Sequence, residues 1–89
     1  MEFRLNRSIR WIHVNDGLVI LEPSSGQILD LNAEATELWD QMRLGHAWTV
    51  EAGATYLATC YLMPYEQAES IVTKFLQELE AGSVISRVS

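Results

Sequence analysis

The sequence is poor in the residues that build disulfide-linked or metal-held scaffolds. It contains a single cysteine, Cys60, so no disulfide can form within the chain. Cys60 stands between Leu57 and Tyr61 in an apolar pattern, where we expect a buried thiol. The two histidines, His13 and His46, are far apart and have no cysteine or carboxylate at metal-ligand spacing. The sequence therefore predicts no disulfide scaffold, no metal centre and no cofactor.

Basic residues are also few. Six lysines and arginines stand against twelve aspartates and glutamates, which gives a formal net charge of −6. A negative surface repels the phosphate backbone of nucleic acids and favours neutral or basic partners. The charge therefore argues against nucleic acid as a partner.

Long hydrophobic runs are missing too. The longest uncharged run, residues 52–65, is broken by Gly53 and Pro64 and is too short and too polar to cross a bilayer. Residues 1–4 lack the apolar core of a signal peptide. We therefore expect a cytoplasmic protein with no membrane partner. Its 89 residues, 48% of them apolar, predict one small domain spanning residues 1–89.

Three β-strands are expected in the first third of the chain. The first contains Trp11, Ile12 and Val14 and ends at an Asp-Gly turn signal. The second, Leu18–Leu21, is apolar on both faces, as is typical of a central strand. The third, Gln27–Leu31, follows a Ser-Gly turn and is the last strand before the helices, so we expect it at a sheet edge.

Three helices are expected to follow. Asn32 and Thr49 are suitable N-caps for the first two, because their side-chain oxygens can accept hydrogen bonds from unpaired backbone amides. Gly45 ends the first helix, Pro64 opens the third and Gly82 ends it. The apolar positions at helical spacing are Ala35, Leu38, Trp39 and Met42, then Val50, Leu57 and Tyr61, then Ala68, Ile71, Val72, Phe75, Leu76 and Leu79. The predicted class is α+β and winged-helix-like, a three-stranded antiparallel sheet followed by three helices.

The expected third strand and third helix together suggest a peptide groove. The strand Gln27–Leu31 contains no lysine or proline, and Asp30 is its one charge, so its edge is poorly protected against pairing. The apolar stripe of the third helix is wider than one small sheet requires. An extended peptide could pair with the edge through main-chain hydrogen bonds, while pockets lined by Leu29, Ile71 and Phe75 select its alternate side chains.

Two charged residues are predicted to flank this pocket. Lys74 and Glu78 have i, i+4 spacing and can pair with each other or with charges on a ligand, and we expect mutual pairing without ligand. The candidate peptide-binding residues are Gln27, Ile28, Leu29, Asp30, Leu31, Ile71, Lys74, Phe75 and Glu78.

The stretch from Asp16 to Trp39, DGLVILEPSSGQILDLNAEATELW, carries the most informative pattern. An Asp-Gly turn, an apolar run, a Ser-Gly turn, a second β-run and a Leu-Asn pair precede Ala35 and Trp39. This order and spacing resemble the core signature of the PqqD-like family, recognition domains that bind leader peptides of ribosomally made, enzyme-modified peptides. The resemblance continues more weakly through residues 64–82.

The resemblance implies a peptide carrier. In this family the leader peptide binds as an extra strand between the third strand and the third helix. Stand-alone members work with a leader-cleaving cysteine protease in lasso-peptide pathways or with a radical enzyme in pyrroloquinoline quinone biosynthesis, and we favour the lasso type. The family position of Ile71 is usually polar. Three roles for the apolar Ile71 remain open. It packs in the core or in a homodimer contact, it lines the groove, or it is a tolerated apolar residue at the surface.

Catalysis is not expected, because no nucleophile, base and electrophile converge in the sequence. Two other functions remain open: a winged-helix DNA-binding protein and a small dimerisation or adaptor module. DNA binding is disfavoured because the third helix carries four glutamates and one lysine, Lys74, whereas a DNA-recognition helix carries a net positive charge. We expect Trp39 in the core, and Trp11 and Trp48 either in the core or at a contact with an enzyme partner. The oligomeric state is left open.

Overall fold

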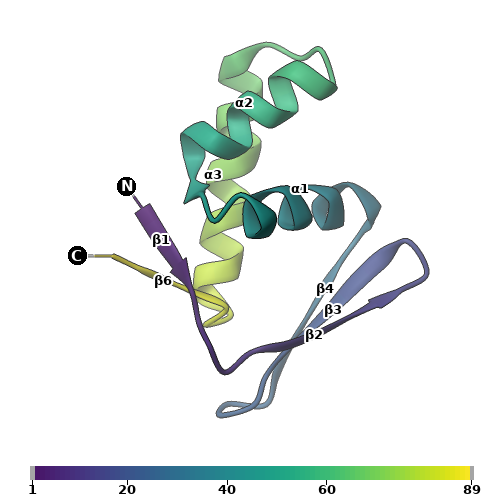
Figure 1. Ribbon diagram of the computed structural model, residues 1–89, viewed down its shortest axis with the longest axis vertical. Helices are drawn as coiled ribbons and strands as arrows, with labels where there is room; N and C mark the ends of the chain where they lie inside the picture. Colours follow the sequence, from purple (N-terminus) through teal and green to yellow (C-terminus); the bar gives the residue numbers. More distant parts are fainter. Residues whose placement is uncertain (1, 89) are drawn as a thin grey trace.

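The computed structural model describes residues 2–88. Within them the elements follow in the order β1 (Glu2–Leu5), β2 (Arg10–Val14), β3 (Gly17–Glu22), β4 (Gln27–Leu31), α1 (Ala33–Leu44), β5 (Trp48–Thr49), α2 (Val50–Cys60), α3 (Tyr65–Ala81) and β6 (Ile85–Arg87). The strands form two antiparallel sheets, β2-β3-β4 and β5-β1-β6. Figure 1 shows α3 between the two sheets. The predicted α+β class, with a three-stranded antiparallel sheet and three helices, is confirmed.

The sheet β2-β3-β4 has one buried face and one open face. Leu18 pairs with Leu31 and Ile20 with Leu29, and of these four only Leu29 is not fully buried. Leu21, the residue after Ile20, points to the other face and is 37% exposed, because the helices cover one side of this sheet (Figure 1). β3 is the central strand, as predicted. Its second apolar face is open to solvent instead of buried.

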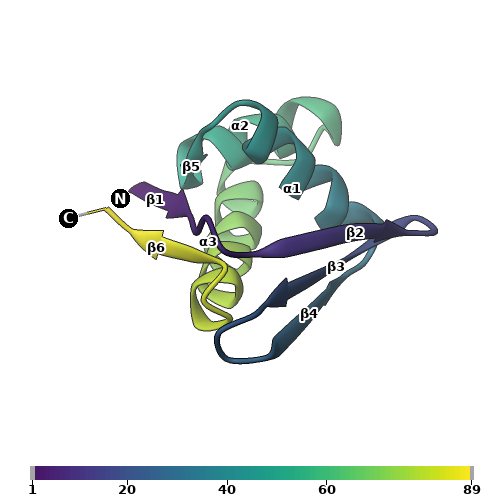
Figure 2. The same ribbon diagram turned by 60° about the horizontal axis from the view of Figure 1, so that its bottom comes forward.

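The second sheet, β5-β1-β6, was not predicted. Its strands have two, four and three residues, too few for an alternating pattern to be recognised. In this sheet Phe3 of β1 pairs with Trp48 on one side and with Arg87 on the other. The sheet thus combines the start, the middle and the end of the chain, as Figure 2 shows for β1, β5 and β6.

The helix boundaries follow the predicted capping residues. Asn32 Oδ1 accepts a hydrogen bond from the Ala35 amide at 2.9 Å, and Thr49 Oγ1 accepts one from the Ala52 amide at 3.1 Å. Pro64 precedes the first residue of α3, and Gly82 follows its last. These local interactions satisfy amides that the helix itself cannot pair.

A cluster of tryptophans forms the centre of the core between α1 and the two sheets. Trp39 is fully buried, as predicted, and Trp48 is 5% exposed. Their ring centroids are 5.2 Å apart in an edge-to-face arrangement, and Trp11 packs on the other side of Trp39 at 5.8 Å. Trp11 is 38% exposed, so Trp48 takes the core role and Trp11 lies at the surface.

Two predictions at the end of α2 were wrong. Cys60 is exposed, and Tyr61, expected to point inward, is 41% exposed. The helix ends at Cys60, and residues 59–62 are all exposed. The Tyr61 hydroxyl donates a hydrogen bond to Glu37. The pKa of Tyr61 is raised to about 12, mainly because this bond stabilises the protonated hydroxyl.

Gly53 marks the closest approach of α2 to α3. A Cβ at this position would lie 2.7 Å from Val72 Cγ1 and 3.0 Å from Val72 Cγ2. Although alanine favours a helix by about 1 kcal/mol over glycine, we expect Gly53→Ala to lower the free energy of unfolding by about 1–2 kcal/mol through overpacking. Urea denaturation followed by circular dichroism measures this change.

The control for this prediction is Thr55→Ala on the exposed face of α2. It removes a β-branched residue without adding an atom to the interface, so its stability should rise slightly or stay unchanged. A Gly53→Ala protein as stable as Thr55→Ala would mean that the two helices have room to separate.

Candidate peptide-binding groove

The strand β4 forms an outer edge of its sheet. Among the described strands it pairs only with β3, so the amides and carbonyls of its other side lack a strand partner (Figure 2). Leu31 is buried and Leu29 half-buried, whereas Ile28 and Asp30 are exposed. The predicted edge position and the predicted alternation of faces are both confirmed.

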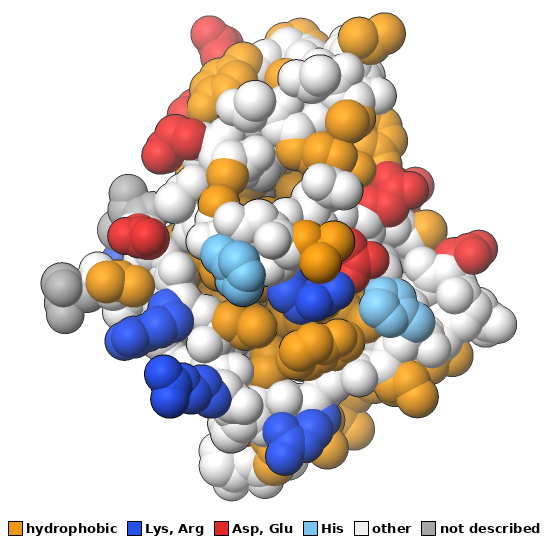
Figure 3. All heavy atoms as spheres, in the orientation of Figure 1, with side chains coloured by type: hydrophobic (Ala, Val, Ile, Leu, Met, Phe, Trp, Pro, Cys, Tyr) orange, Lys and Arg blue, Asp and Glu red, His pale blue; other side chains and the backbone are white. Residues whose placement is uncertain are grey.

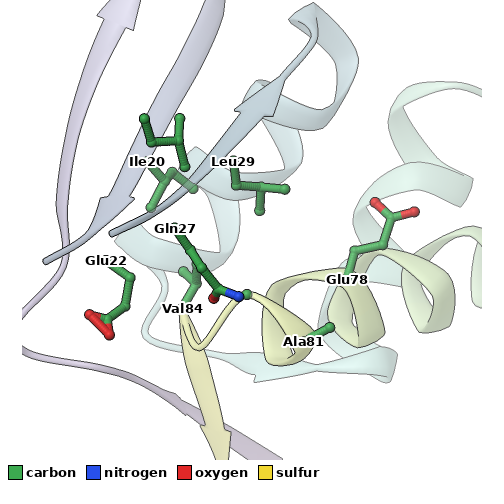
Figure 4. Close-up of a pocket in the computed structure, with 9 residues that line it drawn as sticks. Ile20, Glu22, Gln27, Leu29, Glu78, Ala81 and Val84 are labelled. Carbon is green, nitrogen blue, oxygen red and sulfur yellow. The ribbon is translucent and has the colours of Figure 1, made fainter. Parts of the chain in front are cut away.

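A hollow of about 390 Å³, here called the Leu29 hollow, lies between β4 and the end of α3. In Figure 4, Leu29 on β4 and Glu78 on α3 reach into the space between strand and helix from opposite sides. Its lining consists of Ile20, Glu22, Gln27, Ile28, Leu29, Glu78, Ala81, Gly82 and Val84. The open edge of β4 therefore has a concave surface directly beside it.

Glu22 gives the Leu29 hollow a fixed negative charge. Its side chain is 5% exposed, and it accepts hydrogen bonds from the Ser24 hydroxyl and, at 2.7 Å, from the Ser24 amide. These bonds hold the pKa of Glu22 below its ordinary value, although burial acts in the opposite direction. Glu78 also lines the Leu29 hollow, and no lysine or arginine does, so the Leu29 hollow carries a net negative charge.

A second hollow, of about 310 Å³, lies between the start of α1, the end of α2 and the first half of α3. We call it the Ile71 hollow. Its walls are mostly apolar and consist of Asn32, Glu34, Ala35, Leu38, Leu57, Tyr61, Met63, Ile71 and Phe75. Ile71 is 42% exposed and Phe75 7% exposed, so Ile71 forms the rim and Phe75 the floor. The alternative in which Ile71 fills the core is wrong.

The two hollows follow one another along α3. Ile71 and Glu78, one from each hollow, are about two helical turns or roughly 10 Å apart along the axis. On the facing wall, Leu29 of β4 lines the first hollow and Asn32, before α1, lines the second. Three residues of a bound extended peptide would span about 10 Å, the same distance. An extended segment between β4 and α3 can therefore place side chains in both hollows, and we call this surface the β4–α3 groove.

The structure distributes the predicted pocket over these two hollows. Leu29 lines one and Ile71 and Phe75 line the other, so the three residues do not form a single pocket. Gln27, Ile28 and Glu78 lie in the Leu29 hollow, as predicted for the groove. Asp30 and Leu31 line neither hollow, and their contribution would be through the backbone of β4.

Lys74 does not flank the groove in the way predicted. It lines a separate, shallow hollow on another side of α3, together with Glu51, Glu66 and Glu69. No ion pair joins Lys74 to Glu78 among residues 2–88, so their expected mutual pairing is also wrong. Helical spacing brings both residues to adjacent positions on α3, but only Glu78 faces β4.

Several groove residues escaped the sequence prediction because they come from other elements. Leu57 and Met63 reach the Ile71 hollow from α2 and from the loop before α3. Val84 reaches the Leu29 hollow from the segment between α3 and β6. Leu57 had a signal in its helical spacing, whereas no local pattern placed Val84 near β4.

The described part of the chain contains neither a candidate metal site nor a candidate membrane span. No three His, Cys, Asp or Glu side chains within residues 2–88 are placed to hold a metal ion. No helix in the same residues is long and apolar enough to cross a membrane.

The fold and this groove can be compared with known proteins. The sequence model of the family described as "Coenzyme PQQ synthesis protein D (PqqD)" matches residues 17–85. This match covers most of the chain, from β3 to the first residue of β6. The chain belongs to the PqqD family. The groove of this PqqD family member lies entirely between elements that the match includes. A comparison with curated proteins finds no match.

Two solved structures have the same fold as this PqqD family member. "TbiB1 in Complex with the TbiA(beta) Leader Peptide" has a TM-score of 0.84 and 17% sequence identity, covering 97% of this chain and 98% of that chain. "Lasso peptide synthetase B1 complexed with the leader peptide" has a TM-score of 0.80 and 24% identity, covering 98% of this chain and 100% of that chain. The two TM-scores establish that the fold is shared.

Proposed function

We propose that this PqqD family member binds the leader segment of a ribosomally made precursor peptide and presents it to a processing enzyme. The observation that carries the proposal is the open edge of β4 beside two hollows that α3 completes. The two structures that share the fold are both described as complexes with leader peptides, which supports the same role here.

The groove accounts for recognition by strand addition. The unpaired amides and carbonyls of Gln27–Leu31 give affinity through main-chain hydrogen bonds, which any extended peptide can form. Specificity comes from the hollows. The Ile71 hollow suits an apolar or aromatic side chain, whereas Glu22 and Glu78 favour a polar or basic side chain in the Leu29 hollow.

In this proposal the chain acts as a carrier. Because no nucleophile, base and electrophile converge in its sequence, a separate enzyme would process the bound peptide. Its partner is a leader-cleaving cysteine protease, as in lasso-peptide pathways, or a radical enzyme, as in pyrroloquinoline quinone biosynthesis. The lasso type is supported by the fold shared with a protein described as lasso peptide synthetase B1. DNA binding is disfavoured, because α3 carries Lys74 among Glu66, Glu69, Glu78 and Glu80.

Calorimetric titration tests the proposal. The ligand is a synthetic peptide with the leader sequence of a precursor gene that neighbours the gene for this chain. We expect saturable one-to-one binding, and amide hydrogen exchange at Gln27–Leu31 should slow when the leader is present. The control is β2, the other outer strand of the sheet, whose amides from Arg10 to Val14 should exchange at an unchanged rate. Protection of β2 with no protection of β4 would place the peptide on the wrong edge for this proposal.

A further inference from the structure

A second concave surface lies away from the groove and differs from it in charge. This hollow of about 520 Å³ lies between β1, the start of β2 and the end of α1. Arg4, Arg7, Trp11, Arg43, His46 and Trp48 are among the residues that line it. We call it the basic pocket. Figure 3 shows arginine and histidine side chains gathered on this face with hydrophobic side chains between them.

The charge of the basic pocket is opposite to that of the whole chain. Three of the six lysines and arginines line it, although the formal net charge is −6. Glu2 is the one acidic residue in the lining. Arg4 and Arg7 are exposed and take part in no ion pair within residues 2–88. Their guanidinium groups are therefore available to an anionic partner.

Arg43, the third arginine of the basic pocket, is held in place by its neighbours. The Arg43 guanidinium carbon lies 5.6 Å from the centre of the Trp11 ring, and Arg43 Nη2 lies 3.7 Å from Asp40 Oδ1. Trp11 in turn packs edge-to-face on the buried Trp39. The pocket thus presents an ordered aromatic surface, 38% exposed at Trp11, beside positive charge.

We propose that the basic pocket binds an acidic segment of a protein partner. Carboxylates of the segment contact Arg4 and Arg7, and an apolar or aromatic side chain packs against the exposed part of Trp11. A protein segment fits better than a nucleic acid, because a long phosphate backbone would extend from this pocket onto a surface of net negative charge. Short acidic segments need no basic surface beyond the pocket itself.

The location of the basic pocket makes this a site separate from the peptide groove. The two share no lining residue. The Ile71 hollow is lined by the first half of α1, as far as Leu38, and the basic pocket by its end, from Arg43, about 8 Å further along the helix. A partner in the basic pocket and a peptide on β4 can therefore be bound at the same time. This arrangement would let one partner be recruited while the other remains bound.

An NMR titration of the ¹⁵N-labelled protein tests the proposal. The probe is an unlabelled pentapeptide of four glutamates around a central phenylalanine, at low ionic strength. We expect saturable shifts of the Trp11 indole and of the amides of Arg7 and His46, with Gln27–Leu31 unaffected. The double variant Arg4→Gln/Arg7→Gln should bind about fivefold more weakly, since partly solvated ion pairs each contribute little.

Three controls show whether the pentapeptide binds in the basic pocket and through its charge. Lys74→Gln, which removes one positive charge outside the pocket, should bind the pentapeptide as the parent does. A pentapeptide with glutamines in place of the glutamates should not shift the pocket resonances. The double variant should bind the leader as tightly as the parent, so a failed pocket and a failed groove give different results.

The proposal is overturned if the glutamine peptide binds equally well or if the double variant keeps full affinity. A single-stranded oligothymidylate that binds the pocket more tightly than the pentapeptide would assign it to nucleic acid instead. Concentration-dependent dimers that the double variant abolishes would assign the pocket to a second copy of this chain.

Discussion

Replacing Phe75 with alanine should lower the free energy of unfolding by about 3–4 kcal/mol and also weaken leader binding. Phe75 is 7% exposed, belongs to the core and forms part of the floor of the Ile71 hollow. Its truncation leaves a cavity under α3 and removes apolar surface from the groove. Since a small domain has about 5–10 kcal/mol of stability in total, the loss is a large fraction. Thermal and urea denaturation measure the stability, and calorimetry measures the binding.

A second variant separates the two roles of Phe75. Phe75→Leu retains most of the side-chain volume and should cost about 1 kcal/mol of stability, so its binding can be measured on a fully folded protein. We expect its affinity for the leader to lie between those of the parent and Phe75→Ala. If Phe75→Leu loses stability but binds the leader as the parent does, Phe75 belongs to the core alone.

Replacing Ile71 with aspartate should weaken leader binding by about 1–3 kcal/mol, because a bound apolar side chain would meet a charged group at the rim of its hollow. Ile71 is 42% exposed, so the stability of the free protein should change by less than about 1 kcal/mol. This contrast with Phe75→Ala follows from the structure, in which the two residues share a hollow but differ in burial.

Ile12→Asp provides the matched control for Ile71→Asp. Ile12 is 64% exposed on the outer face of β2, and it lines neither hollow of the groove. The same chemical change there should leave leader affinity unchanged. Equal affinity in Ile71→Asp and the parent would show that the peptide does not enter the Ile71 hollow, even if it pairs with β4.

Short-range features of this PqqD family member could be read from its sequence. The caps at Asn32 and Thr49, the edge strand Gln27–Leu31 and the buried Trp39 were all predicted. Each depends on interactions within a few residues or on a repeating pattern of apolar side chains. The apolar excess on α3 likewise indicated a groove before its walls were known.

The predicted site was less complete, because a helical period fixes the angle between two side chains but not the rotation of the helix against its neighbours. Lys74 and Glu78 are close on α3, yet the packing of α3 turns Glu78 toward β4 and Lys74 toward Glu51 at the start of α2. Leu29 lies beside the end of α3 and Ile71 lies about two helical turns before Glu78, so the groove consists of two hollows along the helix.

Contacts between distant parts of the chain were beyond the sequence pattern altogether. Phe3 pairs with both Trp48 and Arg87, and Arg43 lines one pocket together with Arg4 and Arg7. Local sequence sets which residues form a strand, a cap or an apolar stripe, since those choices follow from nearby backbone and side-chain sterics. The second sheet, the two hollows and the basic pocket come from the packing of segments far apart in the chain, and their geometry exists only once the core around Trp39 has formed.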